Sequence, residues 1–211
     1  MNTLYVKGES IMDNSYKKAL MYEYFTIGYN MIEAVASIFF GALAGSIALI
    51  GFGLDSIVES LSGFVLVWRL KKHDTLTEEE EERIEKKAVR FVGITFFVLG
   101  IYVLYESISK IVMQEVPDPS LPGIIIAIIS MIIMPILAYK KYSLGKKMGL
   151  KSLVADSKET MVCSILSLAL FLGLAGNYFW GFWLADPIAG IVIVIFLFKE
   201  GLELLNEDHD D

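Results

Sequence analysis

Six long apolar stretches constrain the fold of this sequence more than any other feature. A helix needs roughly 20 apolar residues to cross the hydrocarbon core of a bilayer, which is about 30 Å thick. Such stretches run from about Leu20 to Leu43, Ser46 to Trp68, Ala88 to Val112, Pro122 to Tyr139, Leu153 to Ala175 and Pro187 to Leu205. Hydrophobic residues make up 55% of the chain, above the roughly 45–50% of soluble domains. We therefore predict an all-α membrane protein with six transmembrane helices in a lipid bilayer.

Lys and Arg residues gather on one side of these predicted spans. They precede the first span and fill the connections at 69–90 and 140–152, whereas the connections at 114–121 and 176–186 contain neither residue. Cytoplasmic connections of membrane proteins are enriched in Lys and Arg. We therefore expect both termini to be cytoplasmic, in a multi-pass protein of the cell (plasma) membrane.

The predicted spans leave little sequence for other domains. Residues 1–19 are expected to form a cytoplasmic N-terminal segment, residues 20–205 a six-helix transmembrane domain, and residues 206–211 a short acidic cytoplasmic tail, with no soluble C-terminal domain. The longest connection, 69–90, contains the run Glu78 to Glu82 and shows no apolar periodicity. It is predicted to be an inner-face loop whose second part extends the third helix.

Charge and residue content exclude two classes of function. The formal net charge is -7 and no basic face is present, so a nucleic-acid partner is not expected. The predicted spans contain no His, no paired-aspartate protease motif and no nucleophile beside a general base. An intramembrane enzyme is therefore not expected.

Two carboxylates lie in the middle of the second predicted span. A charged side chain near the centre of a membrane helix costs about 2.5–3.5 kcal/mol on insertion scales, and residues that are kept there usually line a site or a pathway. Asp55 and Glu59 are four residues apart, so helical geometry places them one turn apart on the same face. This spacing allows both carboxylates to bind one small cation.

The fifth predicted span repeats this arrangement. Asp156, Glu159 and Cys163 are spaced i, i+3 and i+7, which forms one stripe along a helix. If this face meets that of Asp55 and Glu59, the two helices form a four-ligand cage. Carboxylate oxygens with a thiolate suit zinc, and oxygen-rich sites also accept manganese, iron or cobalt. Whether Cys163 or Asp156 completes the cage stays open.

Each of these residues also has a structural interpretation. Asp55 and Glu59 can form a buried ion pair with Lys158, and Cys163 alone is typical of a small buried apolar residue. Asp156 can cap the fifth helix. In the first span, Asn30 and Glu33 are candidates either for a transport pathway with proton coupling or for helix–helix hydrogen bonds.

The chain resembles the transmembrane domain of the cation diffusion facilitator (cation efflux) superfamily. The matching features, in chain order, are Asn30 and Glu33, Gly45 to Leu49 leading to Gly53 to Glu59, Ala155-Asp156 with Glu159 and Cys163, and Asp186-Pro187-Ile188-Ala189. The resemblance implies six spans and a homodimer that exchanges divalent metal ions for protons. Metal is then the transported substrate, and no cofactor is implied.

The metal-binding positions depart from those of the zinc-transporting members that the chain resembles. Those members have His or Asp followed four residues later by Asp in the second helix, and His followed by Asp in the fifth. Here Asp55 and Glu59 stand for the first pair, and Glu159 and Cys163 for the second. The resemblance also implies a short form, since longer members carry a cytosolic C-terminal domain, so any dimer is expected to form through the membrane helices.

Two other functions compete with metal efflux. One is a structural or regulatory membrane subunit without transport, in which the ammonium group of Lys158 takes the place of the cation. The other is a monovalent cation/proton exchanger that uses the carboxylates alone. In the efflux hypothesis, metal and protons compete for the same carboxylates and thiol, and Lys158 is a candidate for proton coupling.

Overall fold

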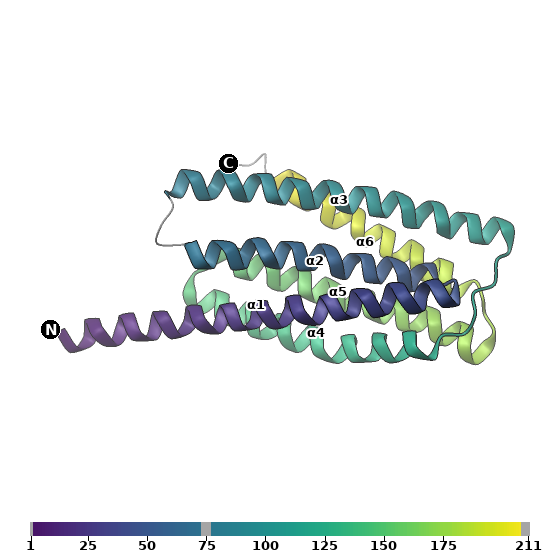
Figure 1. The fold of residues 1–211 in the computed structure, drawn as a ribbon, viewed down its shortest axis with the longest axis horizontal. Helices are drawn as coiled ribbons and strands as arrows, with labels where there is room; N and C mark the ends of the chain where they lie inside the picture. Colours follow the sequence, from purple (N-terminus) through teal and green to yellow (C-terminus); the bar gives the residue numbers. More distant parts are fainter. Residues whose placement is uncertain (1, 73–76, 208–211) are drawn as a thin grey trace.

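The structure, a computed structural model, describes residues 2–72 and 77–207. These residues form six helices joined by short connections (Figure 1). The helices are α1 (Asn2–Ala44), α2 (Ile47–Lys72), α3 (Glu78–Met113), α4 (Leu121–Met148), α5 (Lys151–Trp180) and α6 (Ala185–Glu207). The prediction of an all-α membrane fold with six helices is confirmed.

The helices form a four-helix bundle with a helix pair beside it. In the bundle, α1 packs on α2 and α4 packs on α5, and contacts of α1 with α4 and of α2 with α5 close it. The pair consists of α3 and α6, which pack along each other; both contact α2, and α6 also contacts α5 (Figure 1). The helices α2 and α5 therefore lie between the bundle interior and the pair.

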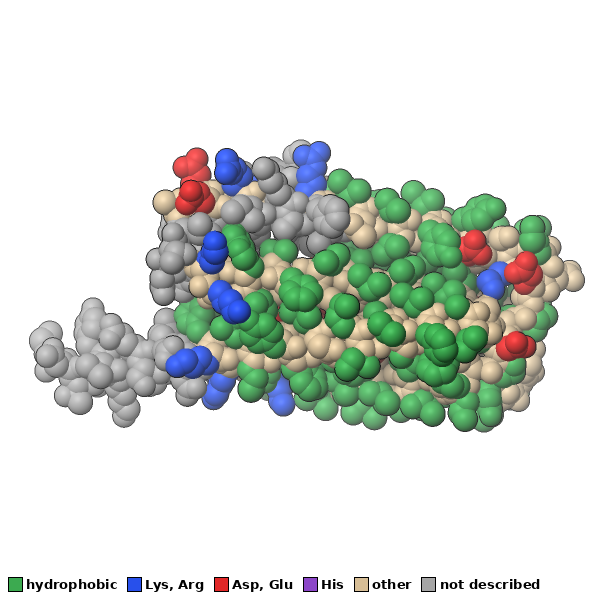
Figure 2. Space-filling model, in the orientation of Figure 1, with side chains coloured by type: hydrophobic (Ala, Val, Ile, Leu, Met, Phe, Trp, Pro, Cys, Tyr) green, Lys and Arg blue, Asp and Glu red, His purple; other side chains and the backbone are tan. Residues whose placement is uncertain are grey.

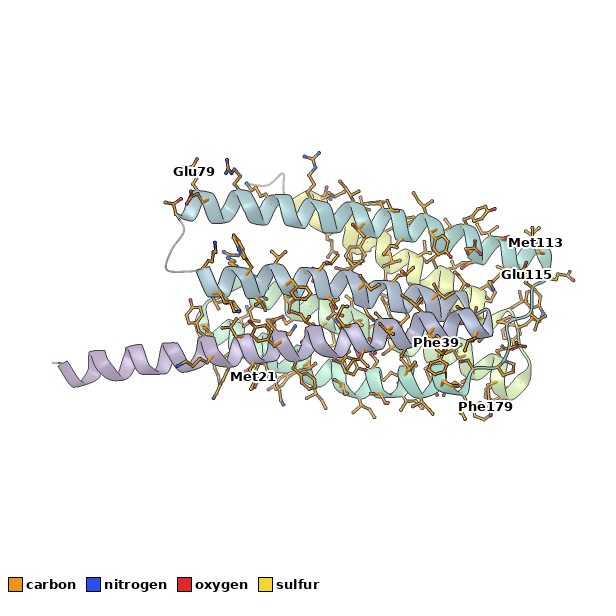
Figure 3. All side chains as sticks on the ribbon, in the orientation of Figure 1. Met21, Phe39, Glu79, Met113, Glu115 and Phe179 are labelled. Atoms are coloured by element: carbon orange, nitrogen blue, oxygen red, sulfur yellow. The ribbon has the colours of Figure 1, made fainter. Side chains whose placement is uncertain are left out.

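Five helices are long and apolar enough to cross a membrane. The spans are Ser15–Ala44, Ile47–Lys72, Gly93–Met113, Leu121–Met148 and Ser152–Trp180, among the described residues. Their outward side chains, such as Phe39 of α1 and Phe179 of α5, are apolar and exposed, as expected for contact with lipid (Figure 3). The sixth helix, α6, runs alongside the others but carries Lys199, Glu200 and Glu203 in its last turns.

The start of α1, the end of α2, the start of α3, the α4–α5 connection and the end of α6 lie at the same end of the molecule (Figure 1). On the face shown in Figure 2, most Lys and Arg side chains gather toward this end, and the middle of the molecule is covered by apolar side chains. The positive-inside rule assigns this end to the cytoplasm. That assignment stays a prediction, and the end is called the inner end below.

The connection between α2 and α3 is more helical than the sequence suggests. The helix α2 continues to Lys72, and α3 begins at Glu78 with Thr77 as its N-cap, leaving only residues 73–76, which include His73, outside the described residues. Thr77 Oγ1 accepts a hydrogen bond from the Glu80 amide at 3.3 Å, and the Thr77 amide donates to Glu80 Oε2 at 3.3 Å. This capping box starts a helix without any apolar periodicity, because it satisfies the free amides of the first turn.

The turn between α1 and α2 is fastened to the helix pair. Gly45 adopts a φ of 63°, which a residue without Cβ reaches at no steric cost. Lys110 of α3 donates a hydrogen bond to the Gly45 carbonyl. Asp186 of α6 accepts hydrogen bonds from the Ser46 hydroxyl and, at 3.0 Å, from the Ile47 amide. These contacts, called the outer latch below, hold the outer end of α2 against α3 and α6.

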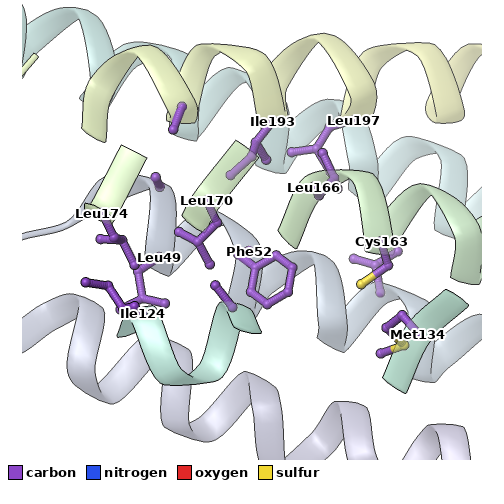
Figure 4. Close-up of a cluster of buried hydrophobic side chains, with 14 of the residues drawn as sticks. Leu49, Phe52, Ile124, Met134, Cys163, Leu166, Leu170, Leu174, Ile193 and Leu197 are labelled. Atoms are coloured by element: carbon purple, nitrogen blue, oxygen red, sulfur yellow. The ribbon is translucent and has the colours of Figure 1, made fainter. Parts of the chain in front are cut away.

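The apolar core lies between α2, α4, α5 and α6. Its centre contains Leu49, Phe52, Leu166, Leu170 and Ile193, all fully buried (Figure 4). The same cluster continues inward to Cys163 (Figure 4). The core therefore fixes the spacing of α2 and α5 directly outward of the polar residues that the sequence analysis identified.

Close packing of α1 on α2 depends on Gly53, and this yields a prediction. A Cβ at Gly53 would lie 2.9 Å from Ser37 Cβ and 2.9 Å from Ile38 Cγ1. We expect Gly53→Ala to lower the free energy of unfolding by about 1–3 kcal/mol, the usual effect of overpacking. Thermal unfolding in detergent, followed by tryptophan fluorescence, measures it. The matched control is Gly28→Ala on α1, where no heavy atom lies within 4 Å; equal melting temperatures for the two variants would contradict the packing described.

Candidate metal site

A small cavity lies between the bundle and the helix pair. Its volume is about 20 Å³, which is room for about one water-sized occupant. It is lined by Asp55 and Glu59 of α2, Phe96 of α3, Glu159, Val162 and Cys163 of α5, and Glu200 of α6. Four acidic side chains and one thiol therefore surround a space of the size of a single ion.

The structure brings both predicted residue pairs to this cavity. Asp55 and Glu59 lie one turn apart on α2, and Glu159 and Cys163 lie one turn apart on α5. The two helices contact each other along this stretch because they share the apolar core immediately outward. Their roles as metal ligands stay a prediction.

The side chains that line the cavity do not converge on a single position. Among the described residues, no three His, Cys, Asp or Glu side chains are close enough to hold a metal ion as they stand. Glu159 instead accepts a hydrogen bond from Ser62 of α2 at 2.8 Å. Binding of a metal ion by this set would therefore require Glu159 and its neighbours to move closer together.

Glu59 is a buried carboxylate at the cavity that lacks a hydrogen-bond partner. Its side chain is 5% exposed, and neither carboxylate oxygen has a hydrogen-bond partner. Buried polar atoms in native proteins are nearly always paired, so an unpaired carboxylate calls for a specific explanation, such as an ion. Glu59 lines the cavity, and a cation in that cavity would supply the missing interaction.

Asp156 lies in a different cluster. Its carboxylate accepts a hydrogen bond from Lys141 of α4 at 2.6 Å, and Lys141 also binds Glu23 of α1 at 3.1 Å. Asp156 is not among the residues that line the cavity, whereas Cys163 is. Of the two alternatives for the fourth ligand, Cys163 therefore has the more direct access to the cavity.

The sequence analysis missed Glu23 and Lys141. It ended the fourth span at about Tyr139, which left Lys141 among the residues of the inner connection. In the structure α4 continues to Met148, so that Lys141 lies about two turns inside the helix and is fully buried. The signal available was the position of Glu23, a carboxylate just inside the first predicted span.

The remaining polar candidates lie away from the cavity lining. Glu33 accepts hydrogen bonds from Tyr29 at 2.9 Å and from Ser56 at 2.9 Å, and thereby links α1 to α2. Asn30 is fully buried, and neither atom of its amide has a partner. The side chain of Lys158 on α5 is exposed on the surface of the protein. It does not occupy the place of a cation between α2 and α5.

Glu200 is a further acidic residue at the cavity that the sequence analysis missed. It follows Ile193 and Leu197 at i+7 and i+3, and those two are buried. One buried face of α6 therefore continues from apolar residues to a carboxylate, which is the same signal that singled out Asp55 and Glu59. Through Glu200 the cavity involves three helices rather than two.

Comparison with known proteins identifies the family of the chain. Residues 24–210 match the family described as the cation efflux transmembrane domain. The chain belongs to the cation efflux family. Its members are transporters rather than enzymes, and the resemblance to the cation diffusion facilitator superfamily is confirmed. This cation efflux protein is a multi-pass membrane protein.

Three relatives illustrate the similarity. Transmembrane protein 163 of Xenopus laevis is 24% identical over 193 residues, covering 91% of this chain and 68% of that protein. The magnetosome protein MamB of Magnetospira sp. is 25% identical over 168 residues, covering 78% and 57% respectively. The cadmium, cobalt and zinc/H(+)-K(+) antiporter of Bacillus subtilis is 23% identical over 208 residues, covering 95% and 64%. The match therefore spans about three fifths of the length of these relatives.

The burial of Cys163 yields a second prediction. This is the single cysteine of the chain, and its side chain is 2% exposed. We expect N-ethylmaleimide to label it slowly in membranes and rapidly after denaturation in SDS, because buried thiols are inert. Mass spectrometry of the labelled protein measures both rates. The matched control combines Cys163→Ser with Glu115→Cys, which places the thiol in an exposed connection. This thiol should react at once in membranes. Equal labelling rates for the two thiols would place Cys163 outside the core.

Proposed function

We propose that this cation efflux protein exports a divalent metal ion from the cytoplasm in exchange for protons. The observation that carries the proposal is the cavity between α2 and α5, lined by Asp55, Glu59, Glu159 and Cys163 within a cation efflux domain. The unpaired carboxylate of Glu59 supports it further, because a cation would compensate that buried charge.

The chemistry of the cavity favours a transition metal as substrate. A thiolate with carboxylate oxygens suits zinc, and the surplus of carboxylates also admits manganese, iron or cobalt. The Bacillus subtilis relative is named for cadmium, cobalt and zinc. We propose zinc as the first ion to test, with manganese as the comparison that relies on oxygen ligands.

Exchange for protons follows from the same residues. Metal binding requires deprotonated carboxylates and thiolate, so protons and metal compete for Asp55, Glu59, Glu159 and Cys163. A rocking of one group of helices against another would then expose the cavity to either side of the membrane in turn. The α3–α6 pair and the α1–α2 and α4–α5 pairs, each of which packs most extensively within itself, are the groups that could move in this way.

We also propose that the protein works as a homodimer formed through its membrane helices. Only 22% of the span Gly93–Met113 in α3 is buried within the protein. Its exposed face carries large apolar side chains, including Val98, Ile101 and Tyr105. A second copy is the proposed partner for part of this face, with lipid covering the rest.

The structure favours transport over a purely structural role. That alternative relied on Lys158 as a substitute for the cation, and Lys158 is exposed. A monovalent cation/proton exchanger is the second candidate function, since carboxylates alone suffice for it. Cys163 at the cavity favours a softer divalent ion over sodium or potassium.

Replacing Asp55 tests the proposed function. In proteoliposomes with a pH-sensitive dye inside, we expect Asp55→Asn to lower zinc-driven proton flux at least about tenfold, since even residues that only support a metal ligand contribute 10–100-fold. The matched control is Asp118→Asn, which removes a carboxylate from an exposed connection and should keep the flux. Undiminished flux in Asp55→Asn would rule out this cavity as the transport site, and sodium-driven flux in its place would favour the monovalent exchanger.

Replacing the thiol tests the choice of metal. We expect Cys163→Ser to weaken zinc and cadmium binding more than manganese binding, because only the softer ions gain from sulfur. Competition assays with a metal-sensitive dye on the purified protein give the three affinities. A uniform loss for all three metals, or no loss, would mean that the thiol does not contact the ion.

A further inference from the structure

A buried cluster of charges lies on the inner side of the cavity and connects three helices. Lys141 of α4 donates hydrogen bonds to Asp156 of α5 at 2.6 Å and to Glu23 of α1 at 3.1 Å. A third contact, at 3.4 Å, joins Lys141 to the Thr160 hydroxyl. The side chains of Lys141 and Glu23 are fully buried, and that of Asp156 is 5% exposed. We call Glu23, Lys141 and Asp156 the inner triad.

The inner triad is not explained by stability alone. Buried ion pairs rarely exceed the stability of apolar residues of the same size, because removing charges from water costs several kcal/mol per ion. The triad also contains two carboxyl groups and only one ammonium group. Glu23 Oε1 and Asp156 Oδ1 have no hydrogen-bond partner. An ammonium group kept in such a place inside a membrane protein points to a role in handling charge.

The triad and the cavity share neighbouring residues. On α5, Thr160 directly follows Glu159 and lies about one turn before Cys163, and Asp156 lies one turn before Thr160. Glu59 of the cavity lies within electrostatic range of Lys141 and Asp156. The groups that surround Lys141 are therefore Glu23 from α1, Glu59 from α2, and Asp156 and Thr160 from α5. A positive charge is thus fixed next to a cavity whose polar lining consists of acidic groups and a thiol.

We propose that Lys141 is a fixed internal cation that sets the affinity of the metal site from its position on the inner side of the cavity, where it contacts Asp156 and Thr160 of α5. Its charge compensates part of the negative charge of the cavity and of the inner triad. It also repels a divalent ion that binds at Glu59. The repulsion weakens binding, so that the ion can leave again on the far side. Lys141 thus acts on the ion through its charge and does not contact it.

The proposal predicts changes of opposite sign within one cluster. Lys141→Met removes the repulsion, and we expect it to tighten manganese binding about tenfold, as interactions between nearby buried charges are strong. Glu23→Gln removes one of the two carboxyl partners of Lys141 and leaves the ammonium group in place, so it should weaken binding severalfold. Lys141→Arg keeps the charge and should bind manganese as the unchanged protein does. Damage to the fold would weaken binding in all three variants and would not produce the opposite signs.

Calorimetric titration of the full chain in lipid nanodiscs with manganese chloride, at constant pH and ionic strength, measures these affinities. If Lys141→Met fails to fold, the comparison moves to the Glu23→Gln background. There, adding Lys141→Met leaves only Asp156 of the inner triad charged and should again tighten binding about tenfold. Unchanged or weaker binding on loss of Lys141, in whichever background folds, overturns the proposal.

This inference rests on the proposed function, and the same titrations separate the two. Suppose that the unchanged chain binds manganese, that Asp55→Asn loses this binding and that Lys141→Met has no effect. This result contradicts only the proposed role of Lys141. No binding of manganese or zinc by the unchanged chain contradicts the proposed function itself. Tighter binding in Lys141→Met and weaker binding in Glu23→Gln support both.

Discussion

A charged group inside a membrane must find its partners within the protein, and this constraint organises the whole structure. Three polar clusters follow one another along the helices: the outer latch at Asp186, the cavity at Asp55 and Glu59, and the inner triad at Lys141. Each one joins helices that are distant in the sequence. Between the first two lies the apolar core around Phe52. The helices are thus held in register by a few polar contacts, and the core fills the space between them.

The clusters differ in how completely their atoms are paired, and the difference fits the roles proposed for them. In the outer latch, both oxygens of Asp186 accept hydrogen bonds, so that this end resists movement. In the inner triad one oxygen each of Glu23 and Asp156 is unpaired, and at the cavity both oxygens of Glu59 are unpaired. The unpaired oxygens of these two clusters therefore lie where a mobile cation would compensate them. A site that must bind and release an ion needs this incomplete pairing, because full pairing by protein groups would leave the ion nothing to gain.

The sequence alone predicted the features that depend on local spacing. The length of the apolar stretches predicted six helices, and one-turn spacing predicted which faces of α2 and α5 carry Asp55, Glu59, Glu159 and Cys163. Lys141 was missed because a helix end near the membrane surface is decided by burial against α1 and α5, which a count of apolar residues does not contain. The partner of Asp156 was missed for the same reason. The exact start of α3 could have been predicted from the sequence, because the Thr77–Glu80 capping box is a local signal. The search for apolar periodicity did not detect it.

The position of the cavity connects the fold to the transport cycle. Phe96 of α3 and Glu200 of α6 form its wall on the side of the helix pair, whereas the proposed ligands come from α2 and α5 of the bundle. The outer latch ties the pair to the α1–α2 turn through Lys110 and Asp186. A small rotation of the pair about this tie would therefore open the cavity toward the inner end while the outer end stays closed. Glu200 would move with the pair, whereas the carboxylates of α2 would stay with the bundle. The same motion would therefore change the number of acidic groups around the ion, and with it the affinity of the cavity for the ion.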